Sequence, residues 1–76
     1  GGLQMIPIGA EVKIRKDLKL GVLYKNRNNK RAMHACRGML LLAGKKAFIT
    51  NNVNNIYSID NGFYYWTDGM FETEWE

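Results

Sequence analysis

Hydrophobic and polar residues alternate in several short segments of the chain, which predicts a fold made mainly of β-strands. Val12 and Ile14 alternate with charged neighbours, as in a strand with one buried face, and form the expected first strand. Further short strands are expected at residues 46–50, 56–59, 63–66 and 70–72, the last closing against the first. The segment "NNVNN" before the strand at 56–59 is predicted to be a turn. About five short strands with a long early loop describe a small, strongly bent barrel.

The strand at residues 46–50 has two unequal faces. Ala47 and Ile49 lie on one face, and Lys46 and Phe48 lie on the other. The smaller pair is predicted to face the core, because this arrangement leaves the lysine in water. Phe48 is therefore predicted to face outward.

One short helix is expected before this second strand, around Arg31 to Leu42. Apolar residues recur there every three or four positions, and Gly44 follows where a helix would end in a left-handed residue. Gly38 costs a helix about 1 kcal/mol relative to Ala, so one helix and two shorter turns both remain open.

The polar stretch at residues 16–31 is interpreted as a long loop with a mobile tip. Its tip is rich in Asn and carries four basic residues, Lys25, Arg27, Lys30 and Arg31. Loops of this length in compact domains are more often functional than idle. These four side chains are therefore candidate contacts to a partner.

The aromatic run from Phe63 to Trp66 follows an Asn-Gly turn signal and must divide between the two faces of a strand. Trp66 and Tyr64 are predicted to face the core, because a small domain needs its largest side chain inside. An outward aromatic patch is the candidate partner-binding surface, and its members are Phe48, Tyr57, Phe63 and Tyr65. Partner binding and coverage by the loop or helix both remain open for this patch.

Length and cysteine content narrow the class of protein. A chain of 76 residues is one small domain, divided into a lead-in or cloning scar at 1–7, the fold at 8–72 and an acidic tail at 73–76. A single cysteine, Cys36, excludes an internal disulfide and favours the cytoplasm. No stretch has the length of a membrane span, and the start lacks the features of a signal peptide.

Charge is distributed unevenly along the chain, whose net charge is +4. All eleven Lys and Arg residues lie between Lys13 and Lys46, whereas most of the seven acidic residues follow them. Three interpretations remain open. The acidic end neutralises part of the basic half, the basic half attracts nucleic acid or an acidic protein through salt-sensitive forces, or the charge serves solubility alone.

Catalytic chemistry is not indicated. His34 lies two residues from Cys36, a spacing that puts side chains on different faces of a helix, and no second Cys or His completes a metal site. Asp68 is explained more simply as the anchor of the turn after Trp66. We therefore expect no catalytic residue, no metal and no cofactor.

Three segments, "IGAEVKIRKDL", "MLLLAGKKAFIT" and "GFYYWTDGMFE", resemble the small SH3-like barrel proteins encoded by phages and prophages of Gram-positive bacteria. The matching positions are Gly9, Val12, Ile14, Arg15, Asp17, Leu18, Met39, Leu42, Gly44, Lys45, Trp66, Thr67, Asp68 and Met70. The chain departs from the pattern at the Asn-rich basic residues 26–31, at Gly69 and in "TNNVNN". The resemblance implies an SH3-like barrel and carries no catalytic or ligand residue with it.

Together these features predict a non-enzymatic binding module. The resemblance implies a phage or prophage accessory protein, and its expected partner is a host or defence protein with an acidic surface, which it could inhibit. Aromatic side chains beside basic ones are typical of interface hot spots. The alternative is a nucleic-acid-binding barrel that uses the basic half and stacks bases on aromatic rings.

Overall fold

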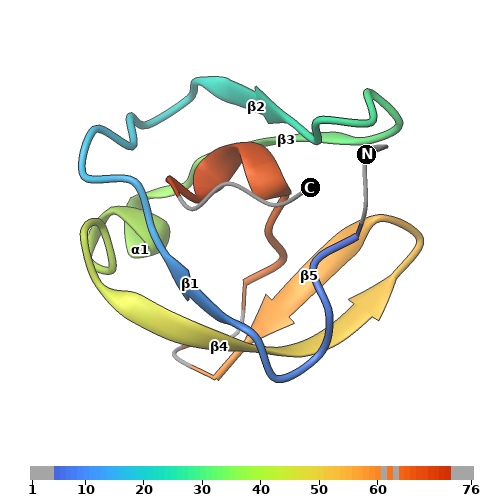
Figure 1. Cartoon of the computed structure of the whole chain (residues 1–76). Helices are drawn as coiled ribbons and strands as arrows, with labels where there is room; N and C mark the ends of the chain where they lie inside the picture. The colour runs from blue at the N-terminus through green and yellow to red at the C-terminus, as the bar shows by residue number, and fades with distance from the viewer. Residues whose placement is uncertain (1–4, 61, 63, 73–76) are drawn as a thin grey trace.

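The computed structural model describes residues 5–60, 62 and 64–72, and within them β-structure dominates. The strands are β1 (Glu11–Lys13), β2 (Leu23–Lys25), β3 (Ala32–His34), β4 (Lys46–Val53) and β5 (Ile56–Ile59). The helices are the single turn α1 (Arg37–Leu40) and the 3-10 turn η1 (Asp68–Met70). Figure 1 shows β2 and β3 on one side of the molecule and the other strands on the opposite side, with η1 between them. The prediction of a mainly β fold is confirmed.

The strands form two antiparallel sheets, one with the order β1-β4-β5 and one made of β2 and β3. β4 and β5 are joined by a two-residue turn at Asn54 and Asn55, whose φ angles are 53° and 67°. Positive φ at both central residues is the conformation that tight hairpins require, and Asn tolerates it. The predicted turn "NNVNN" is therefore shorter than expected, because its first three residues continue β4.

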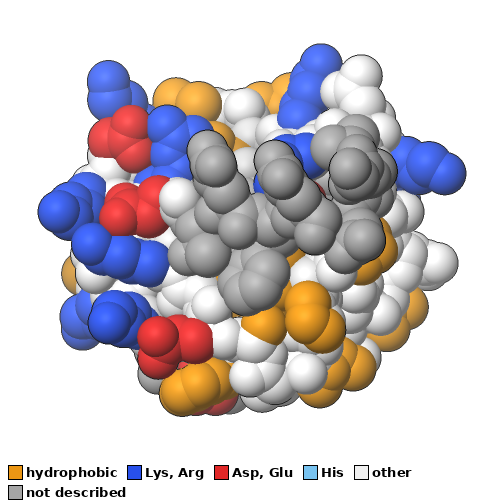
Figure 2. All heavy atoms as spheres, in the orientation of Figure 1, with side chains coloured by type: hydrophobic (Ala, Val, Ile, Leu, Met, Phe, Trp, Pro, Cys, Tyr) orange, Lys and Arg blue, Asp and Glu red, His pale blue; other side chains and the backbone are white. Residues whose placement is uncertain are grey.

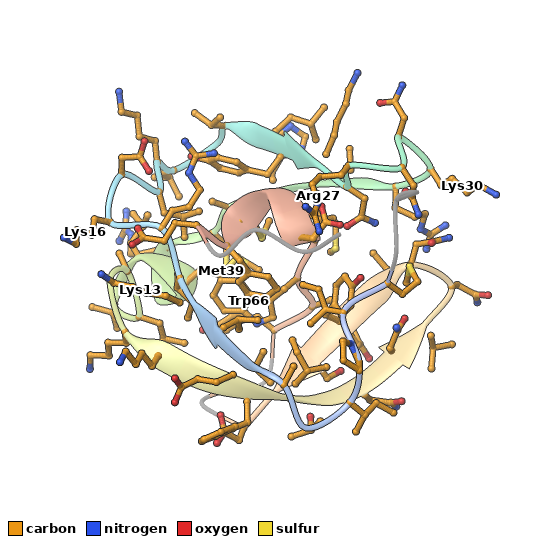
Figure 3. The ribbon with its side chains drawn as sticks, viewed as in Figure 1. Lys13, Lys16, Arg27, Lys30, Met39 and Trp66 are labelled. Carbon is orange, nitrogen blue, oxygen red and sulfur yellow. The ribbon has the colours of Figure 1, made fainter. Side chains whose placement is uncertain are left out.

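Trp66 lies at the centre of the core and is fully buried, as predicted (Figure 3). Its ring stacks on Phe71 with 6.0 Å between the ring centroids, and Phe71 meets the edge of Tyr57 at 6.2 Å. Ala47 and Ile49 are also buried, whereas Phe48 is exposed. The predicted faces of the strand at residues 46–50 are confirmed.

Two expected strands are reduced to isolated pairings in the described part of the chain. Instead of a strand at 63–66, Trp66 alone pairs with Tyr57, through hydrogen bonds of 2.8 and 2.9 Å between their backbones. Instead of a strand at 70–72, Phe71 alone pairs with Ile14, so the chain does close against its first strand. The turn η1 lies between the two pairings. It changes the direction of the chain, so neither pairing continues into a longer strand.

The predicted helix from Arg31 to Leu42 is wrong over most of its length. Ala32 to His34 form β3, Cys36 is extended, and only the four residues of α1 are helical. The apolar residues whose spacing indicated a helix are divided between β3, which pairs with β2, and the single turn α1. Gly38 lies inside α1, where Tyr64 packs against it, and Gly44 has the expected left-handed φ of 80°.

The predicted loop with a mobile tip is instead a hairpin, β2–β3, whose tip is held by side-chain hydrogen bonds. Asn26 is buried, and its Oδ1 accepts a hydrogen bond of 2.7 Å from the backbone N–H of Asp68. The Asp68 carboxylate in turn accepts one of 2.7 Å from the backbone N–H of Arg27, and the Asn26 amide donates to the carbonyl of Asn55. The Asn-rich composition therefore supplies partners for backbone groups.

Residues before the predicted domain start also join the core. Ile6 is fully buried, and its N–H donates a hydrogen bond of 3.1 Å to the Tyr57 hydroxyl. None of the helices within the described residues has the length and apolar character needed to cross a membrane.

Candidate binding groove

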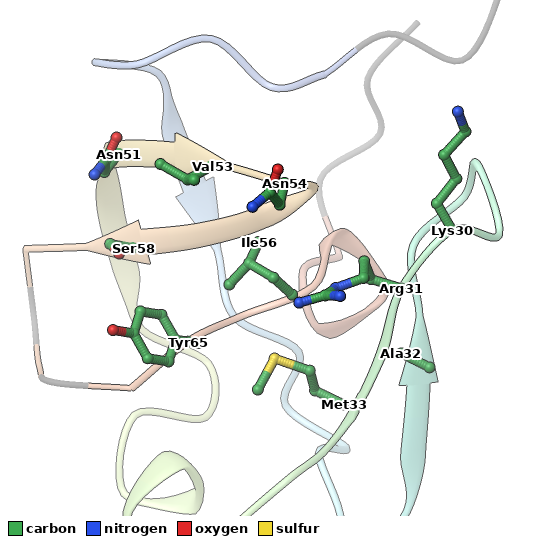
Figure 4. A pocket seen from close by; sticks show the side chains of 10 residues that line it. All are labelled: Lys30, Arg31, Ala32, Met33, Asn51, Val53, Asn54, Ile56, Ser58 and Tyr65. Atoms are coloured by element: carbon green, nitrogen blue, oxygen red, sulfur yellow. The ribbon is translucent and has the colours of Figure 1, made fainter.

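A groove of about 680 Å³ lies between β3 and the β4–β5 hairpin, and we call it the β3 groove (Figure 4). Three parts of the chain that are distant in sequence contribute to it. Its lining residues are Lys30, Arg31, Ala32, Met33, Asn51, Val53, Asn54, Ile56, Ser58 and Tyr65.

The apolar side of the groove is the outer face of β4 and β5. Val53 and Ile56 form a cross-strand pair next to the Asn-Asn turn. Tyr65 precedes the buried Trp66, which pairs with β5, and is itself 60% exposed. These side chains offer a partner an aromatic ring and a patch of aliphatic surface.

The opposite side of the groove carries positive charge. Figure 4 shows the Arg31 side chain pointing into the groove toward Ile56, while Lys30 extends away at one end. None of the described lining residues is acidic. The groove therefore favours a partner that brings negative charge together with apolar groups.

Three of the predicted site residues, Lys30, Arg31 and Tyr65, meet in this groove. Lys25 lies on the other side of the hairpin, where it lines a second hollow of about 600 Å³ with Arg15 and Tyr24. That second hollow also contains Asp17, whose carboxylate is already engaged by Arg15 at 2.9 Å.

Arg27 and Phe48 lie outside the β3 groove. The Arg27 guanidinium is 3.9 Å from the buried Asp68 carboxylate, so the side chain is partly occupied within the fold. Phe48 is 48% exposed, as predicted, but it projects from the start of β4, opposite Glu11. The predicted patch that joined Phe48 to Tyr65 is not one continuous lining of the groove.

Two aromatic assignments are wrong. Tyr57 was expected in the outward patch but is fully buried, because its side of β5 faces the core and its hydroxyl meets Ile6. Tyr64 was expected in the core but is 37% exposed. Residues 64–66 do not form a continuous strand, so strict alternation fails, and the Tyr64 ring packs over Gly38. Phe63 lies outside the described residues.

Asp68 has an unusual environment. Burial raises the pKa of its carboxyl group, and the hydrogen bond from the Arg27 backbone and the Arg27 charge oppose this shift. Its carboxylate holds the hairpin tip, whereas the sequence indicated an anchor for the local turn alone. In the described residues, Asp, Glu, His and Cys side chains gather in no group of three that could hold a metal ion.

A second basic region lies away from the groove. Figure 2 shows Lys and Arg side chains gathered on one flank with acidic side chains among them, and Figure 3 places Lys13 and Lys16 on this flank and Lys30 on the opposite side. Lys13 forms an ion pair of 3.1 Å with Glu72. The basic half of the sequence is therefore split in space and partly neutralised.

The sequence did not reveal the contributions of Met33, Val53 and Ile56 to the groove. Met33 was assigned to a helix, and Val53 to a turn. An alternation signal exists around Tyr24 and Met33, but these residues become strand partners only through a pairing across the hairpin. No protein-family model, curated protein or solved structure matches the chain.

Proposed function

We propose that this chain is a non-enzymatic binding module that holds an acidic segment of a partner protein in the β3 groove. The observation that carries the proposal is the meeting of Tyr65, Val53 and Ile56 with Arg31 in one groove whose described lining has no acidic residue. An aromatic anchor next to an arginine is the composition that dominates binding energy at protein interfaces.

The fold that we infer for the module is an SH3-like barrel. This inference is supported by the pairing of β1 with β4, by the pairing of Ile14, directly after β1, with Phe71, and by the 3-10 turn between the Trp66 and Phe71 pairings. The sequence resemblance supports a phage or prophage accessory protein, with a host or defence protein as partner. The bacterial cytoplasm is the compartment that we propose for this encounter.

Charge reversal in the groove tests this function. The variant Arg31→Glu should lose a partner captured from nuclease-treated bacterial lysate, because it places like charge against an acidic segment. Lys16→Glu makes the same change of charge at an exposed site on the opposite flank and should retain the partner. Equal retention by both variants would contradict a binding site in the β3 groove.

Nucleic-acid binding is the second candidate, and the flank that carries Lys13 and Lys16 favours it (Figure 2). Phosphate contacts release counterions, so such binding should weaken steeply between about 50 and 200 mM salt. A mobility-shift series over this range, with single-stranded and duplex oligonucleotides, measures it. Here Lys16→Glu would weaken binding and Arg31→Glu would weaken it less, the reverse of the order expected for the β3 groove.

A further inference from the structure

One edge of the β2–β3 hairpin is unpaired in the part of the chain that the structure describes. The Asn26 N–H donates to the Arg31 carbonyl at 2.9 Å, and the Ala35 N–H donates to the Val22 carbonyl at 3.1 Å. Backbone N–H and C=O groups alternate in direction along an antiparallel strand. Those of residues 31, 33 and 35 therefore point toward β2, whereas those of Ala32 and His34 point to the opposite side. No hydrogen bond to a described residue occupies the backbone N–H or C=O of Ala32 or His34 on that side.

The unpaired edge borders the β3 groove. Ala32 and Met33 both line the groove, and Figure 4 shows β3 running along it with β2 behind. The opposite edge of the hairpin, along β2, lies away from the groove. There Leu23 and Lys25 line the second hollow, and Gly69 approaches the Lys25 backbone closely.

We propose that the occupant of the groove is an extended acidic segment of a partner protein that pairs with β3 as a third strand of the β2–β3 sheet. This proposal rests on the proposed function and adds the mode of recognition. An exposed strand edge is a template for another chain, and main-chain hydrogen bonds supply affinity while alternate side chains supply specificity.

The groove also defines the side-chain pattern of that segment. Arg31 and Met33 lie on the groove-facing side of β3, two residues apart. A segment residue opposite Arg31 would carry a carboxylate, and the residue two positions along would be apolar and rest on Met33, Ile56 and Tyr65. The intervening residue would point to solvent. The recognised pattern is therefore acidic, any residue, apolar.

A capped synthetic peptide with the sequence Thr-Glu-Thr-Ile-Thr-Glu-Thr tests this pattern, because it presents a carboxylate on both sides of Ile and so allows either strand direction. Binding is measured by fluorescence anisotropy at low salt. The same peptide with Lys in place of Glu should bind at least about ten-fold more weakly, because its charge opposes Arg31.

Backbone pairing is tested by two N-methylated isomers of the acidic peptide, one methylated at the Thr amides and the other at the Glu and Ile amides. Only one of these two sets of amides points toward β3 in an added strand. One isomer should therefore lose about ten-fold or more in affinity while the other retains it. Equal affinity of the two isomers would overturn strand addition and leave the proposed function in place.

Proline substitutions provide the matching test on the protein. Ala32→Pro removes an N–H that points into the groove and is not used by the hairpin, so peptide binding should fall by about ten-fold. Leu23→Pro removes an N–H on the opposite edge of the same hairpin, away from the β3 groove, and should leave peptide binding unchanged. If Ala32→Pro fails to fold, slowed exchange of the Ala32 and His34 amides on addition of the acidic peptide decides the question.

The failures of the two proposals are distinguishable. If none of the peptides binds while the lysate partner still requires Arg31, strand addition with this pattern is overturned and the proposed function stands. If the lysate partner is retained by Arg31→Glu, the proposed function fails, and strand addition fails with it.

Discussion

At Gly69 the chain passes so close to β2 that no side chain fits. A Cβ atom built there would overlap the carbonyl oxygen of Lys25. This contact explains why position 69 is occupied by a glycine. The glycine is a packing requirement of the turn η1 against the hairpin.

Gly69→Ala should therefore lower the free energy of unfolding by about 1–3 kcal/mol, because the backbone of Lys25 must move to admit the methyl group. Chemical denaturation measures the change. Gly62→Ala is the matched control, since its Cβ would meet neighbours at 3.5 Å or more, and the change should stay within about 0.5 kcal/mol. Equal stability of both variants would mean that η1 and β2 are not in contact.

The carboxyl group of Asp68 should make stability depend on pH. Burial raises its pKa in the folded state, so the folded protein binds a proton more readily than the unfolded chain. The stability that this proton contributes is present at low pH and is lost as the pH rises through the folded-state pKa. Relative to the parent protein, Asp68→Asn should therefore gain stability between about pH 3 and pH 7.

Melting curves of the parent and Asp68→Asn across this range test the sign. Asp17→Asn is the control with the opposite sign, because the hydrogen bond from Arg15 lowers the pKa of the Asp17 carboxyl. The stability that the ionised Asp17 carboxylate contributes is present at neutral pH and is lost as the pH falls through its folded-state pKa. The effect is small because the site is exposed. If the melting temperature of the parent protein instead rises above that of Asp68→Asn as the pH increases, the account of Asp68 is contradicted.

The hairpin β2–β3 is the element that differs most from the sequence prediction. The buried faces of the strands could be predicted at Val12, Ala47 and Ile49. Charged residues that must stay in water lie on the opposite face of each strand, so only one face of each strand can be buried. The hairpin could not be predicted, because alternation of apolar and polar residues around Tyr24 and Met33 is weak. Their pairing also depends on the conformation of the tip. The side-chain contacts of Asn26 to Asp68 and Asn55 join residues far apart in sequence, and no local pattern encodes them.

Asn26→Ala should destabilise the protein by about 1–3 kcal/mol, because it leaves the buried N–H of Asp68 without its partner. Asn28→Ala is the control at the same tip. It removes a half-buried contact of 2.7 Å to the Asn55 side chain and the exposed acceptor of the Lys30 backbone N–H, and should cost at most about 1 kcal/mol. Thermal unfolding of the two variants compares them, and a larger loss for Asn28→Ala would show that the tip is held differently.

At the scale of the whole molecule, function depends on how the elements face one another. The β3 groove combines residues 30–33, part of the β4–β5 hairpin and Tyr65. The sequence predicted these as the end of a loop and the start of a helix, as a turn and a strand, and as part of an aromatic run. Basic and aromatic residues could be identified as candidates from their types alone. Their grouping could not, because Tyr57 is buried and Tyr64 is exposed, the reverse of the prediction, and because Lys30 lies opposite Lys16.

The central claim is that the β3 groove, rather than exposed aromatic surface in general, holds the partner. Tyr65→Ala and Phe48→Ala compare two exposed rings, one in the groove and one outside it. Both substitutions should change the free energy of unfolding by less than about 0.5 kcal/mol.

The decisive measurement is the affinity of these two variants for the captured partner. Truncating an anchor at an interface commonly costs about 2 kcal/mol or more, so Tyr65→Ala should weaken binding by about 30-fold or more. Phe48→Ala should bind like the parent protein. Loss of binding by Phe48→Ala with full binding by Tyr65→Ala would contradict the account and move the site to the start of β4.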